Sequence, residues 1–242
     1  MTATEATKFA QQLTYRCEHA CYNVDVVVCP PFTALRSVQV TLGFDSKSRI
    51  LIGAQDVFWE ESGAFTGAVS AAMLKDVACS FCIIGHSERR EYFYETDEDV
   101  ARKAAALLKV GISPLICCGE SLEVRESGQA AQWVSAQVVA ALQMVSAEDA
   151  KSVVLAYEPL WAIGTGRTPS SEQADEICRV LREVFAGLYG VEAADGLRIL
   201  YGGSMNPGNV EAFAAMPNID GGLVGGASLD ADDFTALAKA FS

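Results

Sequence analysis

The stretch VVLAYEPLWAIGTG (residues 153–166) joins a short apolar run to a glycine-rich segment. The run from Val153 to Tyr157 has the length of a strand and no polar alternation, which is typical of a strand buried on both faces. Glu158 follows it directly. Since strands of this kind form parallel sheets, the stretch predicts an α/β fold with chemistry at the carboxyl end of the strand.

Six further apolar runs of strand length lie along the chain, with longer amphipathic segments between them. The runs are Asp25 to Cys29, Ile50 to Ala54, Phe81 to Ile84, Pro114 to Cys118, Arg198 to Tyr201 and Gly222 to Val224. The clearest helical patterns are Thr4 to Cys21, Asp97 to Val110, Gln129 to Val145, Ser171 to Leu188 and Asp230 to Phe241. This alternation predicts βαβ units in one domain spanning residues 1–242. A count of seven strands and eight helices, starting with a helix, favours a (β/α)8 barrel lacking its first strand.

The composition excludes several classes of protein. The formal net charge of −13 argues against binding to nucleic acid or to an acidic membrane surface. No apolar run approaches the length of a membrane span, and no secretory signal is visible. The eight cysteines lie mostly in apolar runs, which favours the reducing cytoplasm. Cys79 and Cys82 form a C-x-x-C spacing, but no second pair completes a zinc site.

Two titratable residues stand directly after predicted strands. His86 follows the third run in IIGHSERR (residues 83–90), and Glu158 follows the fifth. A buried carboxylate at a strand end, before an apolar and glycine-rich loop, suits a general base beneath a lid. The alternatives are a hydrogen-bonded loop histidine and a solvated turn. The other histidine, His19, lies inside a predicted helix and is interpreted as a surface residue.

Glycine-rich loops follow the last two predicted strands, as YGGS (residues 201–204) and GGLVGGASL (residues 221–229). In a β/α barrel such loops lead into a short helix, and their exposed N–H groups hold a phosphate. Any single glycine pair could equally be a tight turn. Two such loops at consecutive strand ends favour a phosphate site, which would hold an anion despite the negative net charge.

Taken together, the stretches at residues 85–90, 156–166, 201–204 and 221–229 resemble the signature stretches of the triosephosphate isomerase family, in the same order and spacing. Residues 53–56 and 63–67 resemble the interdigitating dimer loop of that family. The similarity runs from Met1 to Ser242, so it implies a TIM (β/α)8 barrel over the whole chain.

The resemblance implies an isomerase that interconverts dihydroxyacetone phosphate and D-glyceraldehyde 3-phosphate through an enediolate, in glycolysis and gluconeogenesis. Glu158 would move the proton and a neutral His86, its pKa depressed by a helix N-terminus, would polarise the carbonyl. The other residues implied are Ser87, Glu88 and Cys117 as support, Gly164, Ser204, Gly225 and Gly226 for the phosphate, and Pro159, Trp161, Ile163, Thr165 and Gly166 in the lid. It also implies a homodimer formed through the loop around Gln55, Phe65 and Thr66, with no metal and no organic cofactor.

The sequence departs from the family pattern in two places. The family begins with a strand that ends in Asn-x-Lys, and Met1 here matches the position just after that motif. We therefore expect turnover at least about 1,000-fold below that of a chain carrying the strand, because a preorganised cation is missing. We also expect weak dimerisation and apolar, aggregation-prone sheet edges at Asp25–Cys29 and Gly222–Val224. Ala68 replaces a glutamate in the dimer loop.

Two other functional interpretations remain open at this point. One is a non-catalytic phosphate-binding or scaffold protein on the same barrel. The other is a different phosphate-handling barrel isomerase. An in-frame Asn-x-Lys upstream of Met1 would favour the triosephosphate isomerase.

Overall fold

The computed structural model describes residues 1–18, 21, 23–43, 48–163 and 168–242. Seven parallel strands form one sheet in the order of the sequence. They are β1 (Val27–Val28), β2 (Leu51–Ala54), β3 (Phe81–Ile84), β4 (Ser113–Cys118), β5 (Val154–Tyr157), β6 (Arg198–Tyr201) and β7 (Gly221–Gly222). All seven predicted runs are confirmed as strands, although the first is shorter than predicted and the last lies slightly earlier. Within the described residues, β1 pairs with β2 alone and β7 with β6 alone.

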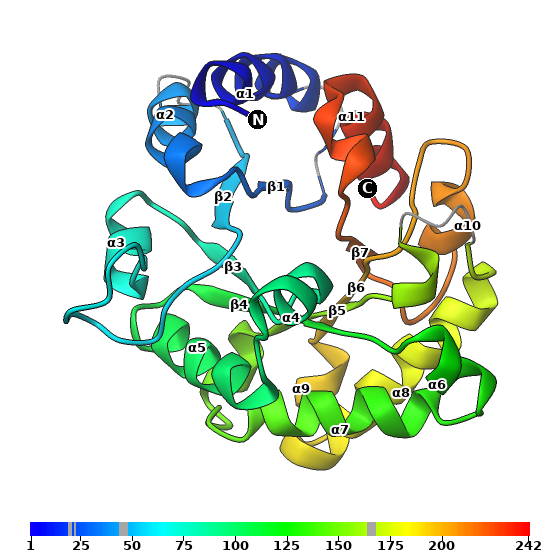
Figure 1. Ribbon diagram of the computed structural model, residues 1–242. Coiled ribbons are helices and arrows are strands. Elements are labelled where there is room, and N and C mark those ends of the chain that lie inside the picture. The colour runs from blue at the N-terminus through cyan, green and yellow to red at the C-terminus, as the bar shows by residue number, and fades with distance from the viewer. Residues whose placement is uncertain (19–20, 22, 44–47, 164–167) are drawn as a thin grey trace.

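Most helices lie around the outside of the curved sheet, as Figure 1 shows, while α4 lies in front of the strands; this is the architecture of the predicted (β/α)8 barrel. Helix α1 lies between α2 and α11 and contacts both. The α-helices are α1 (Ala3–Cys17), α2 (Phe32–Gly43), α3 (Ala71–Asp76), α4 (Ser87–Phe93), α5 (Asp97–Lys109), α6 (Leu122–Glu126), α7 (Ala130–Leu142), α8 (Ser171–Tyr189), α9 (Val191–Asp195), α10 (Val210–Ala214) and α11 (Ala231–Ala240). None of the helices formed by the described residues is both long and apolar enough to cross a bilayer.

The predicted count of eight helices was too low, because the described residues alone form eleven α-helices. Several of the additional ones have only five to seven residues, too few to show a helical period in the sequence. Side-chain caps hold two of them: Ser121 accepts the N–H of Val124 at the start of α6, and His86 accepts the N–H of Glu88 at the start of α4. Three short 3₁₀ helices complete the connections, at Asp149–Ser152, Leu160–Ala162 and Gly226–Leu229.

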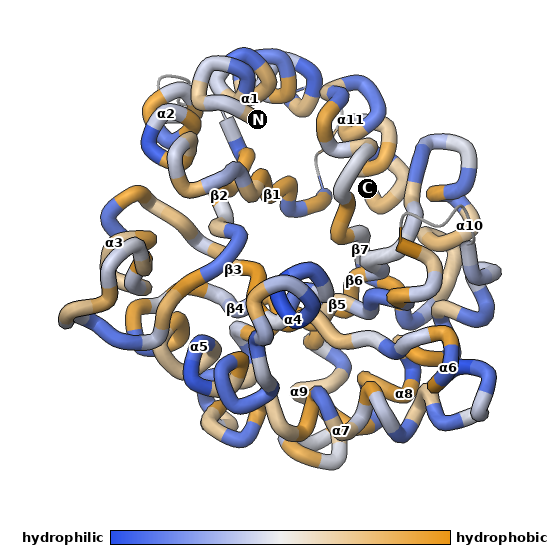
Figure 2. Tube along the Cα trace, viewed as in Figure 1, coloured by the Kyte–Doolittle hydropathy of each residue, from blue (hydrophilic) through white to orange (hydrophobic). Residues whose placement is uncertain are grey.

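The strands are buried on both faces, as their continuous apolar sequences predicted. On β4, Leu115 and Cys117 face a small inner cluster, which also contains Ile83, Val154 and Ala156 from the neighbouring strands. The residues between them, such as Ile116 and Leu155, belong to the larger cluster beneath the helices. Successive side chains of a strand point to opposite faces, so one strand serves both clusters. Figure 2 shows the hydrophobic residues along the strands and the hydrophilic ones on outward turns of the helices.

Candidate active site

Glu158 is positioned by the carboxyl end of β5. Its N–H donates to the carbonyl of Cys118 at 2.8 Å, and the N–H of Gly202 donates to the carbonyl of Tyr157 at 2.7 Å. A Cβ atom at Gly119 would lie 1.7 Å from the carbonyl oxygen of Glu158, and one at Gly202 would lie 2.8 Å from its Cγ. The residue after β4 must therefore be glycine for the backbone of Glu158 to pass, and a side chain at Gly202 would displace the side chain of Glu158.

His86 stands at the end of β3, one residue beyond Gly85, and is the N-cap of α4. Its Nε2 lies 3.0 Å from Oε1 of Glu158. The other carboxylate oxygen accepts the N–H of Ser87 at 3.0 Å, although Ser87 and Glu158 are 71 residues apart in the sequence. Since the Glu158 side chain is only 2% exposed, the fold places a buried carboxylate against a histidine ring and a backbone amide.

The hydrogen bonds of His86 assign its tautomer. Nδ1 accepts the N–H of Glu88 at 3.3 Å, so in the neutral ring the proton lies on Nε2, which faces Glu158. Burial lowers the pKa of His86, but the hydrogen bond and charge of Glu158, together with the charges of Glu88 and Glu95, outweigh it and raise the pKa. The expectation of a depressed pKa is wrong for this arrangement, because a carboxylate contacts the ring.

Two of the predicted supporting residues, Cys117 and Glu88, differ in burial and in their contacts with the site. Cys117 is fully buried on the inner face of β4, and burial, followed by the charge of Glu158, raises the pKa of its thiol. It is therefore a packing residue beneath the carboxylate and not a nucleophile. The Glu88 side chain is 70% exposed, with its carboxylate 3.9 Å from Nδ1 of His86, so its backbone N–H makes the closer contact.

The predicted lid begins directly after Glu158. Pro159 precedes the 3₁₀ helix at Leu160–Ala162, which contains Trp161, and Ile163 follows it. The hydroxyl of Ser204 donates to the carbonyl of Ala162 at 2.9 Å, so the loop after β6 touches the start of the lid. The other predicted lid and phosphate residues on this segment, Gly164, Thr165 and Gly166, lie outside the described residues.

The loop after β7 carries the remaining predicted phosphate residues. Gly225 precedes the 3₁₀ helix at Gly226–Leu229, and a Cβ atom at either glycine would have no neighbour within 4 Å among the described residues. The N–H of Ser228 donates to the carbonyl of Gly225 at 3.0 Å, which closes the turn. Both glycines are exposed, so solvent reaches the backbone at the start of this turn.

Glu120 is a buried residue of the site that the sequence analysis missed. It is fully buried, and its Oε1 accepts the Tyr157 hydroxyl at 3.0 Å and Trp161 Nε1 at 2.9 Å. Within the described residues its Oε2 has no hydrogen-bond partner. The signal was present in the sequence, because Glu120 follows a predicted strand and a glycine, as His86 does. Glu120 anchors the lid segment to the strand that carries Glu158.

The predicted dimer loop leaves β2 and reaches α3. Gln55 Nε2 donates to the carbonyl of Cys29 at 2.9 Å, which fixes the base of the loop. Farther along, Phe65 is 44% exposed and packs against Phe58, with ring centroids 4.7 Å apart and ring planes tilted by 52°, and Thr66 is exposed. The N–H of Ala68 donates to the carbonyl of Phe65 at 3.0 Å, so the loop keeps a turn at the position where the family has a glutamate.

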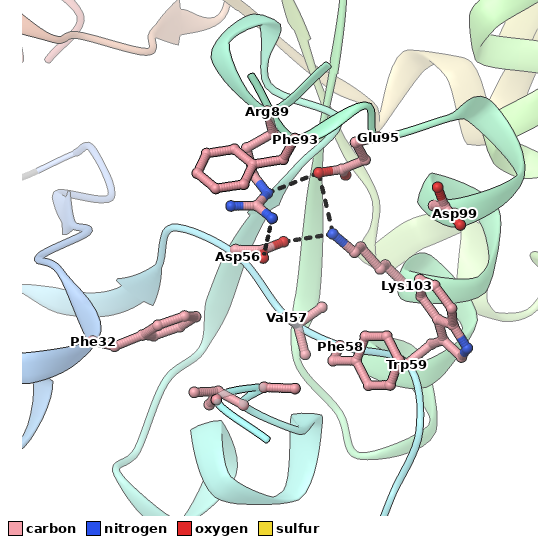
Figure 3. Close-up of a pocket in the computed structure, with 13 residues that line it drawn as sticks. Phe32, Asp56, Val57, Phe58, Trp59, Arg89, Phe93, Glu95, Asp99 and Lys103 are labelled. Carbon is pink, nitrogen blue, oxygen red and sulfur yellow. Dashed lines mark hydrogen bonds and ion pairs between the residues drawn. The ribbon is translucent and has the colours of Figure 1, made fainter. Parts of the chain in front are cut away.

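A cavity of about 390 Å³ lies at the base of this loop, beside α4 and α5 (Figure 3). It is lined by aromatic residues, among them Phe58, Trp59 and Phe93, and by an ion network. In the network Asp56 and Glu95 each contact both Arg89 and Lys103. Because two acids meet two bases, the network is neutral overall. In the part of the chain that the structure describes, no three His, Cys, Asp or Glu side chains gather as a metal ion requires.

The chain is similar to known proteins of one family. The family model for triosephosphate isomerase matches residues 1–241. The triosephosphate isomerase of Acetivibrio thermocellus is 51% identical over 239 residues, covering 98% of this chain and 93% of the relative. That of Lactiplantibacillus plantarum is 49% identical over 238 residues, with the same coverage. That of Lactobacillus delbrueckii subsp. lactis is 50% identical over 217 residues, covering 90% and 85%. The chain therefore belongs to the triosephosphate isomerase family.

Proposed function

We propose that this chain interconverts dihydroxyacetone phosphate and D-glyceraldehyde 3-phosphate, with Glu158 as the base and His86 as the electrophile. The observation that carries the proposal is the buried Glu158 carboxylate, held between His86 Nε2 and the Ser87 N–H. A carboxylate fixed at the end of β5 can accept a proton, and the ring presents Nε2–H as a donor. Together they can move a proton between two adjacent carbons and stabilise the oxygen of the enediolate.

Substrate binding would change the protonation of the histidine. The Glu158 contact is the main influence that raises the pKa of His86. When a substrate oxygen takes the place of the carboxylate at Nε2, that influence weakens, and burial favours the neutral ring. A neutral ring can then give its Nε2 proton to one substrate oxygen and take a proton back from the other. A charged ring holds its proton too weakly to recover that proton after giving it up.

The test replaces each residue in turn and measures kcat. Glu158→Gln keeps the shape of the side chain and removes the base, and His86→Gln removes the ring. Each should lower kcat by about 100- to 10,000-fold, while Glu91→Gln on the exposed face of α4 should leave it unchanged. Wild-type protein in D₂O should also place deuterium on the substrate carbon that Glu158 reprotonates. A Glu158→Gln variant that keeps more than about a tenth of kcat would contradict the assignment.

We further propose that the substrate phosphate binds to backbone N–H groups of Gly225 and Gly226, with Ser204 and Gly164, beneath a lid formed by residues 159–168. The open turn at Gly225 and the contact of Ser204 with the lid segment support this arrangement. Titration with inorganic phosphate should shift the amide resonances of both glycines. Shifts confined to other parts of the protein would exclude this site.

We propose that two copies of the chain form a homodimer through the loop around Gln55, Phe65 and Thr66. The exposed Phe65 and Thr66 support the proposal, since a half-exposed aromatic residue on a projecting loop suits an interface. Thr66→Glu should reduce dimer content in sedimentation velocity, whereas Thr4→Glu, an equally exposed threonine on α1, should not. Equal sedimentation of the two variants would place the interface elsewhere.

We propose a cytoplasmic location. All eight cysteines are free thiols, which is typical of a protein kept in a reducing compartment. Fractionation of cells that express a tagged chain tests this directly, and recovery of the chain outside the cytoplasmic fraction would contradict it.

A further inference from the structure

Both backbone polar groups of Gly85 are held by side chains. Its N–H donates to Glu95 Oε1 at 2.9 Å, and its carbonyl accepts Arg90 Nε at 2.7 Å. Gly85 is the residue between the end of β3 and His86. The peptide groups on both sides of this glycine are therefore fixed immediately before the histidine.

The packing around Gly85 leaves little space for a side chain. Its φ of +70° lies in the left-handed region, which an L-residue adopts only with strain. A Cβ atom there would lie 3.0 Å from each of three atoms, which belong to Arg90, Cys117 and Val100. The turn is packed on all of these sides, so its direction depends on the side chains that contact it.

The two holding side chains are themselves fixed by further contacts. Arg90 donates from Nη1 to Asp97 Oδ1 at 2.6 Å and from Nη2 to the carbonyl of Cys117 at 3.4 Å. One guanidinium thus joins the end of β3, the end of β4 and the first residue of α5. The Glu95 side chain is only 2% exposed, and its Oε2 lies 2.8 Å from Arg89 Nε and 3.1 Å from Lys103 Nζ.

We infer that Arg90 and Glu95 are positioning residues that set the place of the His86 ring between the Glu88 N–H and Glu158. Neither residue reaches the ring by a hydrogen bond of its own, so each acts through Gly85. The inference rests on the proposed role of His86. If the two residues were only structural, replacing them would lower stability and leave the ring in place. If they position the ring, replacing them must also displace the ring.

The test compares Arg90→Lys with Arg102→Lys, a matched control in which an exposed arginine pairs with Glu98 on α5. Lysine keeps the charge opposite Asp97 but lacks the planar fork that reaches Gly85 and Cys117. We expect kcat to fall about tenfold in Arg90→Lys with KM within about twofold, because a displacement well under 1 Å already reduces the rate of a preorganised site. Arg102→Lys should match the wild type.

The second readout is the ¹⁵N spectrum of the imidazoles, which is simple because the chain has only two histidines. In a His19→Gln background, the signals of His86 are the only imidazole signals that remain. In Arg90→Lys these signals should move and lose their single-tautomer pattern, since the Glu88 and Glu158 contacts loosen. Asp97→Asn, which keeps Arg90 but removes its ion pair, should give a smaller change in the same direction.

The outcomes separate this inference from the proposed function. If the His86 signals of a folded Arg90→Lys protein match the wild type, the positioning role is refuted. If they move while kcat stays at the wild-type value, the positioning role holds and the catalytic role of His86 is refuted. Should Arg90→Lys not fold, Asp97→Asn decides by the same two criteria.

Discussion

Replacing Lys103 with methionine should destabilise the protein strongly, because it leaves two carboxylates, the buried Glu95 and the partly buried Asp56, with one cation. The Lys103 side chain is 5% exposed, with Nζ 2.6 Å from Asp56 Oδ1 and 3.1 Å from Glu95 Oε2. Arg89 contacts the same two acids. Methionine keeps most of the aliphatic stem, so the variant isolates the loss of the ammonium.

The size of the effect follows from these distances. At an effective dielectric near 20, the two contacts are worth about 6 and about 5 kcal/mol of Coulomb energy. Removing the lysine also removes the cost of burying its charge, which offsets a large part of this energy. Breaking a buried pair from one side typically costs about 3–5 kcal/mol, and we expect the free energy of unfolding to fall by that amount.

The assay is urea unfolding at pH 7, followed by fluorescence and circular dichroism. The control is Lys109→Met at the end of the same helix, where Lys109 and its partner Glu61 are both 70% exposed, so a change below about 0.5 kcal/mol is expected. Adding Asp56→Asn to Lys103→Met restores charge balance with Arg89 and Glu95, and should recover a substantial part of the loss. A Lys103→Met variant as stable as Lys109→Met would refute the reasoning.

Three further predictions concern separate parts of the fold. Ala78 follows the C-cap of α3 with φ 59°, in the left-handed region that favours glycine. Ala78→Gly should therefore raise stability by about 1 kcal/mol and the melting temperature, measured by calorimetry, by about 2–4 °C. An unchanged or lower melting temperature would contradict this. Tyr157→Phe removes the 3.0 Å bond to the buried Glu120 and should cost about 1.5–3 kcal/mol in urea unfolding, so a loss below about 0.5 kcal/mol would count against that bond. The pKa of His86 is raised above 6.5, so the stability that it gains from Glu158 is complete below that pH and is lost as the pH rises through the raised pKa. His86→Asn should therefore lose more stability at about pH 5.5 than at about pH 8, and equal losses would refute the coupling.

Much of the architecture could be predicted because it depends on local pattern. The run from Val153 to Tyr157 is apolar at every position, and its short length favours a strand covered on both faces. The helix count was wrong for a related reason: segments as short as Leu122–Glu126 form through a cap and their neighbours, and not through a period that a reader can detect. The bounds of the edge strands also depend on pairing partners, which local sequence does not specify.

The sequence by itself determined the class of the sheet and the placement of His86 and Glu158, the proposed catalytic residues, directly after strands. Only the tertiary structure decided how these residues meet. The approach of Glu158 to Ser87 and His86 depends on β4 lying between β3 and β5, and on the register of three strands. The contacts of Glu120, Arg90 and Lys103 likewise join different elements of the fold. A single sequence encodes the propensities of each segment, whereas the distance between two side chains is set by the packing of all segments at once.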